Sequence, residues 1–263
     1  MQDKGLSLLR NNAVFLDVLF FFLACFLVHS VYVFYVHPIS AEEISGAVLM
    51  GAVPKRTVWL ILKDLEQELC LILAIWCIFM LFNRYRILSE DSRLIQLDFL
   101  GFRAGGYTLA SVEGKLAEAE GLGIETYLIP GCRTFLDNFK VSGSVEDSKK
   151  IAFEHYELSE EVLESRLQLI NFILWAIPSV GFLGTVRGIG QALADADQAL
   201  AGDIANVALN LGIAFNSTFV ALLLSLFLTF IASTLRGRDI DRLIKSKRYI
   251  SENLAMHFKN LKV

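Results

Sequence analysis

The stretch that decides the fold is Pro178–Gly190, PSVGFLGTVRGIG. It is apolar enough for a membrane, yet it carries small and hydroxylated residues where a helix that faces lipid carries Leu and Phe. Gly181, Gly184 and Gly188 recur at spacings of three and four, so they fall along one face of a helix. Such small residues let another helix backbone approach closely. The stretch therefore predicts a membrane helix packed tightly against a neighbour, with Thr185 at the edge of the packed face.

The run Leu209–Ser225, LNLGIAFNSTFVALLLS, predicts the neighbouring helix. One of its faces is built from Leu, Ile, Val and Phe, and the other from small and polar residues. The small and polar face comprises Asn206, Asn210, Gly212, Ala214, Ser217, Thr218, Ala221 and Ser225. Polar side chains at membrane depth either find partners inside a helix bundle or line a wet cavity. We therefore expect this face to be turned toward other helices or toward a path for ions.

Composition places the chain among integral membrane proteins. Hydrophobic residues make up 54% of its 263 positions, and the mean hydropathy is +0.51. The net charge of −4 gives no sign of a nucleic-acid partner. The four cysteines suggest packing residues, and the four histidines lack metal-ligand spacing. Because no phosphate loop, nucleophile elbow or catalytic acid–histidine pair is recognisable, we expect neither an enzyme nor a cofactor.

Apolar runs predict four membrane helices, at about 13–36, 65–82, 167–193 and 204–235. The predicted organisation is a segment 1–82 with the first two spans and their extracytoplasmic connection, a cytoplasmic helical section 83–166, the third and fourth spans within 167–235, and a basic tail 236–263. Of the 24 Lys and Arg residues, 20 fall in the amino end, the 83–166 section and the tail. The positive-inside rule therefore places both termini in the cytoplasm.

Three shorter helices are predicted outside the spans. We expect a short interfacial helix at Val58–Leu62, and cytoplasmic helices at Val112–Glu120 and Glu154–Arg166. Glycine and proline predict breaks between the cytoplasmic helices, at Gly101, Gly105–Gly106, Gly121, Gly123, Pro130–Gly131 and Gly143.

Two stretches of the chain resemble a known family. The segment IPSVGFLGTVRGI, residues 177–189, resembles the proline, glycine and GTV signature of the MotA/TolQ/ExbB proton channel family, and LGIAFNSTFVALLLS is similar to the helix that follows it there. The resemblance implies that these helices line the pore of a homopentameric ring. In that family the ring encloses two copies of a single-span MotB/TolR/ExbD-like partner, which carries the ion-binding aspartate in the membrane.

The resemblance also implies roles for individual residues. Family hydroxyls near the partner aspartate match Thr185 and Thr218, and the other predicted pore-lining residues are Asn210, Ser217, Gly181, Gly184 and Gly188. Pro178 belongs to the signature, and because proline removes a backbone hydrogen bond, we expect it to kink the pore helix. TolQ-like and ExbB-like members carry a glutamate where this chain has Ile213, so a glutamate-assisted route is not expected here.

Two charged residues leave alternatives open. Asp17 lies one turn inside the first apolar run, where it either contributes to ion passage or subunit contact or reaches the membrane interface. Arg187 lies near the outer end of the third span. It either anchors the helix at the interface, where Asp195 or Asp203 of the following turn could meet it, or presents a charge to the partner at the outer mouth.

The expected function is that of a channel-forming subunit in a motor complex of the bacterial inner membrane, driven by the ion motive force. The alternative is a passive membrane scaffold, in which the glycines only pack helices and the hydroxyls only satisfy backbone carbonyls. Protons are the expected ion, because a titrating carboxylate and a water chain are enough to carry them, and sodium stays open. The process that the complex powers is not indicated by the sequence.

Overall fold

In the computed structural model, the residues described are 2–50, 56–96, 99–101, 108–121, 126–200 and 204–259, and every regular element in these ranges is a helix. Four helical segments are long and apolar enough to cross a membrane: Phe15–Ala47, Leu65–Arg86, Val145–Ala194 and Val207–Phe258. The predicted all-α membrane fold with four spans is confirmed. The predicted five-fold ring stays a prediction.

The chain divides into two compact units. The first comprises Met1–Met80 and Leu169–Ile231, and the second comprises Leu81–Gln168 and Ala232–Val263. Three long helices contribute residues to both units: α4 (Leu65–Gln96), α7 (Val145–Ala194) and α9 (Ala205–Tyr249).

The first unit begins with a helix that outlasts its predicted span. Helix α1 (Gln2–Val31) continues through the π-helical turn η1 (Tyr32–Val36) into α2 (His37–Leu49), although Pro38 lacks a backbone N–H. The wider hydrogen bonding of the π turn directly before this proline is what allows the helix to continue. The short helix α3 (Val58–Leu62) confirms that this segment is helical, its interfacial place stays a prediction, and the Thr57 hydroxyl caps it by accepting from the Leu60 N–H at 3.2 Å.

Helices α1 and α4 pack together in the first unit through aromatic and aliphatic side chains. The Phe20 and Phe79 rings are stacked with their centroids 3.4 Å apart. Val28, Tyr32 and Ile72 form a buried cluster between the two helices. Many large apolar side chains of the unit point outward instead, among them Phe26, Trp175 and Phe230. Side chains of this kind on the outside are what a unit surrounded by lipid requires.

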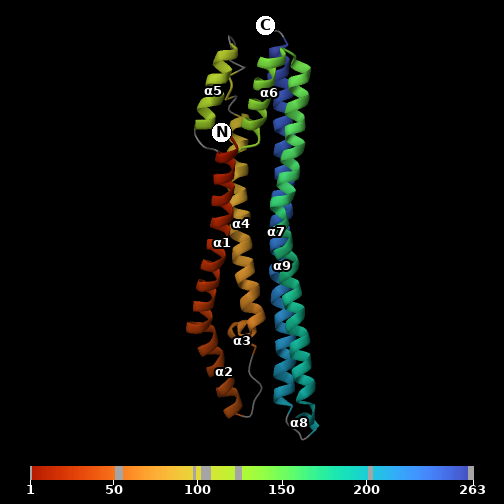
Figure 1. The fold of residues 1–263 in the computed structure, drawn as a ribbon. Coiled ribbons are helices and arrows are strands. Elements are labelled where there is room, and N and C mark those ends of the chain that lie inside the picture. The colour runs from red at the N-terminus through yellow and green to blue at the C-terminus, as the bar shows by residue number, and fades with distance from the viewer. Residues whose placement is uncertain are drawn as a thin grey trace. The chain divides into compact units, whose positions relative to one another are not determined.

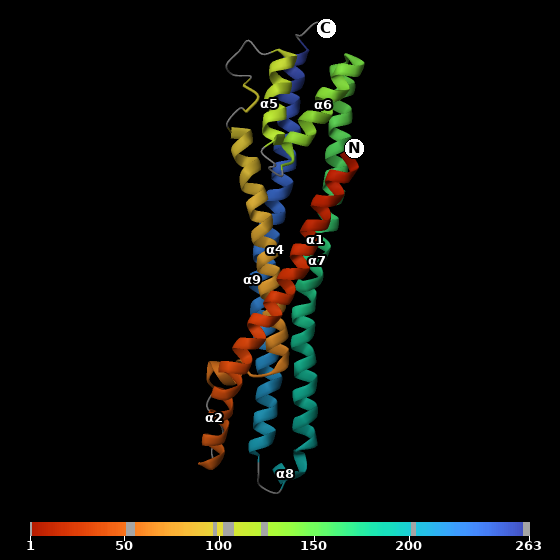
Figure 2. The same cartoon turned by 60° about the vertical axis from the view of Figure 1, so that its left-hand side comes forward.

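Helices α7 and α9 form a hairpin in the first unit, joined through α8 (Ala196–Leu200). Figure 1 shows the two helices running side by side, with α8 at the turn. Figure 2 shows α8 and α2 at the same end of this unit. The end that carries α2 is therefore also the end at which the α7–α9 hairpin turns.

The second unit contains α5 (Leu109–Gly121), α6 (Leu128–Ser142) and the chain end, where η3 (Ile250–Ala255) leads into α10 (Met256–Phe258). Its core holds the rings of Phe135, Phe139 and Phe258, with centroids 5.0 to 6.3 Å apart. Helix α5 confirms the prediction at Val112–Glu120.

The predicted break at Pro130–Gly131 is wrong, because both residues lie inside α6. Pro130 falls in the first helical turn, where the missing N–H has no helical partner to lose. Gly131 is buried, and a Cβ there would collide with the Tyr156 ring, so a glycine is needed for the close approach of α6 to α7. The break at Gly143 is confirmed, since this residue ends α6 in the left-handed conformation with φ 63°. Gly105–Gly106 and Gly123 lie outside the described residues.

A buried ion pair also holds the second unit together. The Asp239 carboxylate of α9 is fully buried, and it accepts from the Arg84 guanidinium of α4, with Nε 3.1 Å from Oδ2. Tyr127 directly precedes α6, and its hydroxyl donates to Asp239 Oδ1 at 3.1 Å. Burial raises the pKa of Tyr127 above its ordinary value, so its hydroxyl stays protonated and can donate to the carboxylate.

Candidate functional site

Gly181, Gly184 and Gly188 lie where α7 meets α9. A Cβ at Gly188 would lie 2.7 Å from the backbone N of Ala214 and 2.7 Å from the carbonyl O of Asn210. A Cβ at Gly181 would lie 2.5 Å from the Ala221 Cβ and 3.3 Å from the Ser217 carbonyl O. The distances below 3.0 Å are too short for a real side chain. The two backbones therefore approach as closely as the spacing of the glycines predicts.

Thr185 and Thr218 meet across this hairpin. Their hydroxyl oxygens are in direct contact, and both residues are half-buried. One of the two hydroxyls therefore donates to the other, and the remaining hydrogen is left for a backbone carbonyl; the Thr218 oxygen lies 3.0 Å from the Gly181 carbonyl and the Thr185 oxygen 3.1 Å from the Ala214 carbonyl. Each hydroxyl has only one hydrogen but two lone pairs. With one hydrogen used within the pair and the other directed at a backbone carbonyl, the remaining lone pairs can still accept hydrogen bonds from a water, a hydronium ion or a protonated carboxyl group.

Ser217, which the sequence groups with this pair, lies beside it at the same two carbonyls, those of Ala214 and Gly181, whereas Asn210 lies apart. Ser217 is 1% exposed, and its hydroxyl donates to the Ala214 carbonyl at 3.0 Å. It also lies against Gly184 and is sealed within the helix packing. The Asn210 amide donates to the Asp195 carboxylate at 2.7 Å, near the turn of the hairpin. Of the four polar residues predicted to line the path, the structure therefore gathers Thr185, Ser217 and Thr218 around two carbonyls, with Ser217 buried, and places Asn210 apart.

Pro178 does not interrupt α7, which is one helix from Val145 to Ala194. A proline leaves the carbonyl four residues earlier without its helical N–H partner, and here that carbonyl belongs to Leu174. The Ser225 hydroxyl of α9 donates to the Leu174 carbonyl at 3.4 Å. A hydroxyl from the neighbouring helix thus takes the place of the missing donor, as a helix within lipid requires.

Arg187 pairs with two acids that the sequence analysis did not assign to any role. Its Nη2 lies 2.7 Å from Glu66 Oε2 in α4 and 3.5 Å from Oδ1 of Asp64, the residue just before α4. Asp195, one of its predicted partners, accepts instead from Asn210, and Asp203 lies outside the described residues. A signal was present in the sequence, since acids at the start of an apolar span call for a nearby cation.

Asp17 lies at the contact between α1 and α4. Its backbone carbonyl accepts from the Trp76 indole N–H at 2.9 Å, and its side chain is half-buried. This hydrogen bond fixes the backbone at Asp17 but assigns no task to its carboxylate, so the two roles considered for Asp17 stay predictions.

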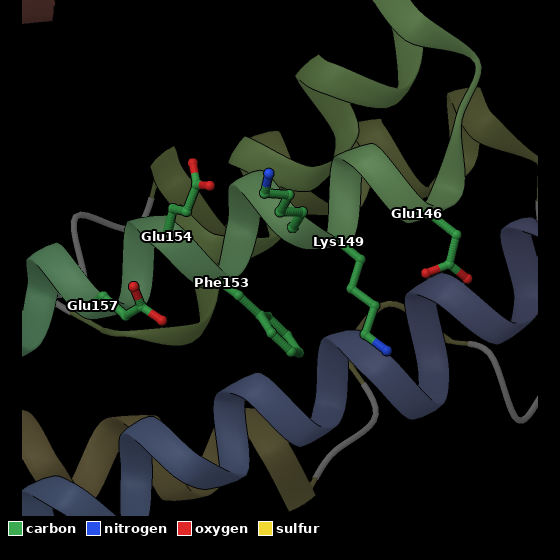
Figure 3. A pocket seen from close by; sticks show the side chains of 6 residues that line it. Glu146, Lys149, Phe153, Glu154 and Glu157 are labelled. Carbon is green, nitrogen blue, oxygen red and sulfur yellow. The ribbon is translucent and has the colours of Figure 1, made fainter.

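No group of three or more Asp, Glu, His or Cys residues in the described parts of the chain could hold a metal ion. A hollow of about 420 Å³ in the second unit is lined by six residues of α7, of which Figure 3 labels Glu146, Lys149, Phe153, Glu154 and Glu157. Lys149 lies over the Phe153 ring, with Nζ 5.5 Å from its centroid. Because the lining comes from one helix and mixes both signs of charge, it does not define a site for a particular ligand.

This geometry defines a class of protein. It is a helical membrane protein with a glycine-packed hairpin and a pair of hydroxyls beside it. Residues 131–248, which contain that hairpin, match the model of the MotA/TolQ/ExbB proton channel family. The resemblance seen in the two sequence stretches is thereby confirmed, and these residues belong to that family. The matched residues are thus similar to a channel-type membrane subunit. Comparisons with curated proteins and with solved structures gave no match.

Proposed function

We propose that this chain is the channel-forming subunit of a proton-driven motor complex in the bacterial inner membrane. Five copies form a ring around two copies of a single-span MotB/TolR/ExbD-like partner, and proton flow through the ring drives mechanical work by that partner. The proposal extends the family match at residues 131–248 to a specific assembly and task.

The contact between Thr185 and Thr218 is the observation that carries the proposal. Both side chains are half-buried in the isolated subunit, so another chain or a file of water can still reach them. Their unused lone pairs suit a group that carries a proton into the path. The sealed Ser217 and the hairpin glycines set the spacing of the pair, because the close contact leaves the two helices no room to move closer.

The partner is needed because the two pore helices contain no acid within the membrane. Neither 167–194 nor 204–235 contains an Asp or Glu. A proton path needs at least one group that titrates, since hydroxyls alone do not bind and release protons near neutral pH. The partner's membrane aspartate supplies that group in the proposal, and it exchanges its proton beside the two threonines. No further cofactor is required.

The proposed orientation places both termini in the cytoplasm. It rests on the positive-inside distribution of Lys and Arg, and on α2 and α8 lying at the same end of the first unit, as expected for two connections on the outer side. The second unit then lies in the cytoplasm, where its charged surface is solvated.

A passive scaffold is the second candidate function, and one observation favours it. Both threonine hydroxyls lie within hydrogen-bonding distance of backbone carbonyls, Thr218 of Gly181 and Thr185 of Ala214. Hydroxyls in membrane helices often make such bonds with no role beyond packing. In this case the family resemblance reflects the packing of the hairpin, and no ion passes.

Assembly is tested by purifying the chain in mild detergent, with and without the co-expressed product of a neighbouring small membrane-protein gene, and measuring the mass of the intact complex. The proposal predicts five copies of the chain, and two copies of a single-span subunit with a membrane aspartate when both are expressed. A monomer or dimer that never closes into a ring in either preparation contradicts the channel and leaves the scaffold.

A further inference from the structure

Glu66, in the first turn of α4, lies next to Gly184 of the hairpin. A Cβ added at Gly184 would lie 3.1 Å from the Glu66 Cγ and would also collide with the Ser217 side chain. Gly184 directly precedes Thr185. The first turn of α4 therefore brings a carboxylate next to the predicted path, although α7 and α9 carry none there.

The Glu66 carboxylate is paired with Arg187, at 2.7 Å between Oε2 and Nη2. Arg187 follows Thr185 by two residues, roughly 3 Å along the helix axis. Its side chain is 40% exposed, whereas that of Glu66 is 12% exposed. The Glu66 side chain is thus mostly buried, and the more exposed Arg187 guanidinium lies against it.

Several other charged groups that the structure describes at this end of the first unit have partners. Asp64 lies 3.5 Å from Arg187 and 3.2 Å from Lys63, and Glu68 lies 2.8 Å from the His29 ring. Arg56 donates to the Asn216 amide at 3.3 Å, and Asp195 accepts from Asn210 at 2.7 Å. Since Asp64 also neutralises Lys63, Glu66 is the principal counter-ion of Arg187.

An unpaired guanidinium at this position would act on any proton that passes the threonines. A fixed charge about 10 Å away in a partly polar environment changes the proton affinity of a group by roughly tenfold. A free positive charge at Arg187 would therefore hold an approaching carboxyl group in its ionised form and repel cations. Pairing with an acid removes most of that field.

We propose that Glu66, assisted by Asp64, is a positioning residue of the ion path that neutralises Arg187 and holds it against α4. The threonine pair is then free of a net positive field, and a carboxyl group that reaches it can take up a proton. This inference rests on the proposed function, but the charge relationship at its centre can be measured on this chain alone.

The test places a thiol at the pair, as Thr218→Cys, in a chain whose four native cysteines are replaced by alanine. The thiolate is the reactive form, so the pH of half-maximal modification by a methanethiosulfonate reagent reports the local field. Purified protein in detergent is used, with unfolding temperature and elution volume as checks on folding. The variants Glu66→Gln, Arg187→Gln and their combination are compared with the parent.

Glu66→Gln is expected to lower the pH of half-maximal modification by about half a unit to one unit, because Arg187 is left unpaired. Arg187→Gln should raise it, and the double variant should return close to the parent. Glu68→Gln is the matched control, because Glu68 lies on the same helix but pairs with His29. Its shift should be less than half that of Glu66→Gln.

The inference is overturned if Glu66→Gln leaves the pH of half-maximal modification unchanged, or shifts it no more than Glu68→Gln does. If Glu66→Gln does not fold, Asp64→Asn is used instead, because it keeps the 2.7 Å pair of Glu66 with Arg187. A smaller shift of the pH of half-maximal modification in the same direction then supports the inference, and no shift overturns it. Because no ion flux is measured, a failure of proton conduction would reject the proposed function without affecting this result.

Discussion

The Ser225 hydroxyl of α9 donates to the Leu174 carbonyl of α7 at 3.4 Å. Leu174 lies four residues before Pro178, so this carbonyl has no N–H partner within its own helix. A polar residue that the sequence places on the small and polar face of α9 therefore completes the backbone hydrogen bonding of α7 at the proline.

This relationship predicts a dependence between two substitutions. Ser225→Ala should lower the free energy of unfolding by about 1 kcal/mol, because the carbonyl loses its donor. In a Pro178→Ala background the helix supplies an N–H to Leu174, and the same change should cost clearly less. Denaturant unfolding in detergent of the four proteins of this double-mutant cycle measures the coupling. Equal costs in both backgrounds would show that Ser225 does not serve the proline.

The close approach at Gly188 predicts a large effect of one added methyl group. Gly188→Ala places a Cβ 2.7 Å from the Ala214 backbone N, so the hairpin must separate, at a cost of roughly 1–3 kcal/mol in unfolding free energy. Gly190→Ala is the control, since nothing lies within 4 Å of its added Cβ. The control should be neutral or slightly stabilising because alanine favours a helix. If both variants unfold alike, the glycine packing is not what holds α7 to α9.

The buried pair in the second unit predicts that Asp239 is essential for stability there. Asp239→Asn leaves the Arg84 guanidinium buried without an opposite charge, which costs about 3–5 kcal/mol. Asp241→Asn removes an exposed carboxylate that pairs with Lys245 at 2.7 Å, and such pairs are worth about 0.3–0.5 kcal/mol. The free energy of unfolding should therefore fall much more in Asp239→Asn than in Asp241→Asn. A cost below 1 kcal/mol for Asp239→Asn would contradict this account of the pair.

Because Tyr127 is half-buried, its ionisation at high pH should lower the stability of the fold. Burial raises the pKa of Tyr127 above its ordinary value, although Arg84 beside it acts in the opposite direction. A pKa that is higher in the folded than in the unfolded chain gives a stabilising contribution that is complete below about pH 10, the ordinary tyrosine value, and is lost as the pH rises further. The difference in stability between the wild type and Tyr127→Phe should therefore shrink or reverse above about pH 10. A difference that is constant up to pH 11 would show that Tyr127 ionises equally in both states.

The sequence predicts the membrane part of this protein well because lipid imposes simple rules. Apolar runs must be helical, and glycines at spacings of three and four mark a contact between helices, so both the four spans and the packed face around Gly184 could be recognised. The contact between Thr185 and Thr218 followed from a resemblance, since spacing alone cannot pair two residues on different helices.

The parts that could not be predicted depend on tertiary contacts. Helix α6 continues through Pro130 and Gly131 because the proline falls in its first turn and the glycine faces Tyr156, neither of which local sequence reveals. The ion pair of Glu66 with Arg187 joins residues 121 positions apart. Such a pair is visible only once α4 and α7 have been placed together.

The central claim is that protons pass beside the hydroxyls of Thr185 and Thr218, and proton flux tests it most directly. The complex with its small subunit is reconstituted into liposomes, a potential is applied, and internal pH is followed by dye fluorescence. Thr218→Val, which keeps the side-chain shape but removes the hydroxyl, should abolish at least nine-tenths of the flux, about 1.4 kcal/mol in barrier height, with assembly intact. Thr218→Ser should retain most of it. Full flux in Thr218→Val, or none in the assembled wild type, would contradict the claim.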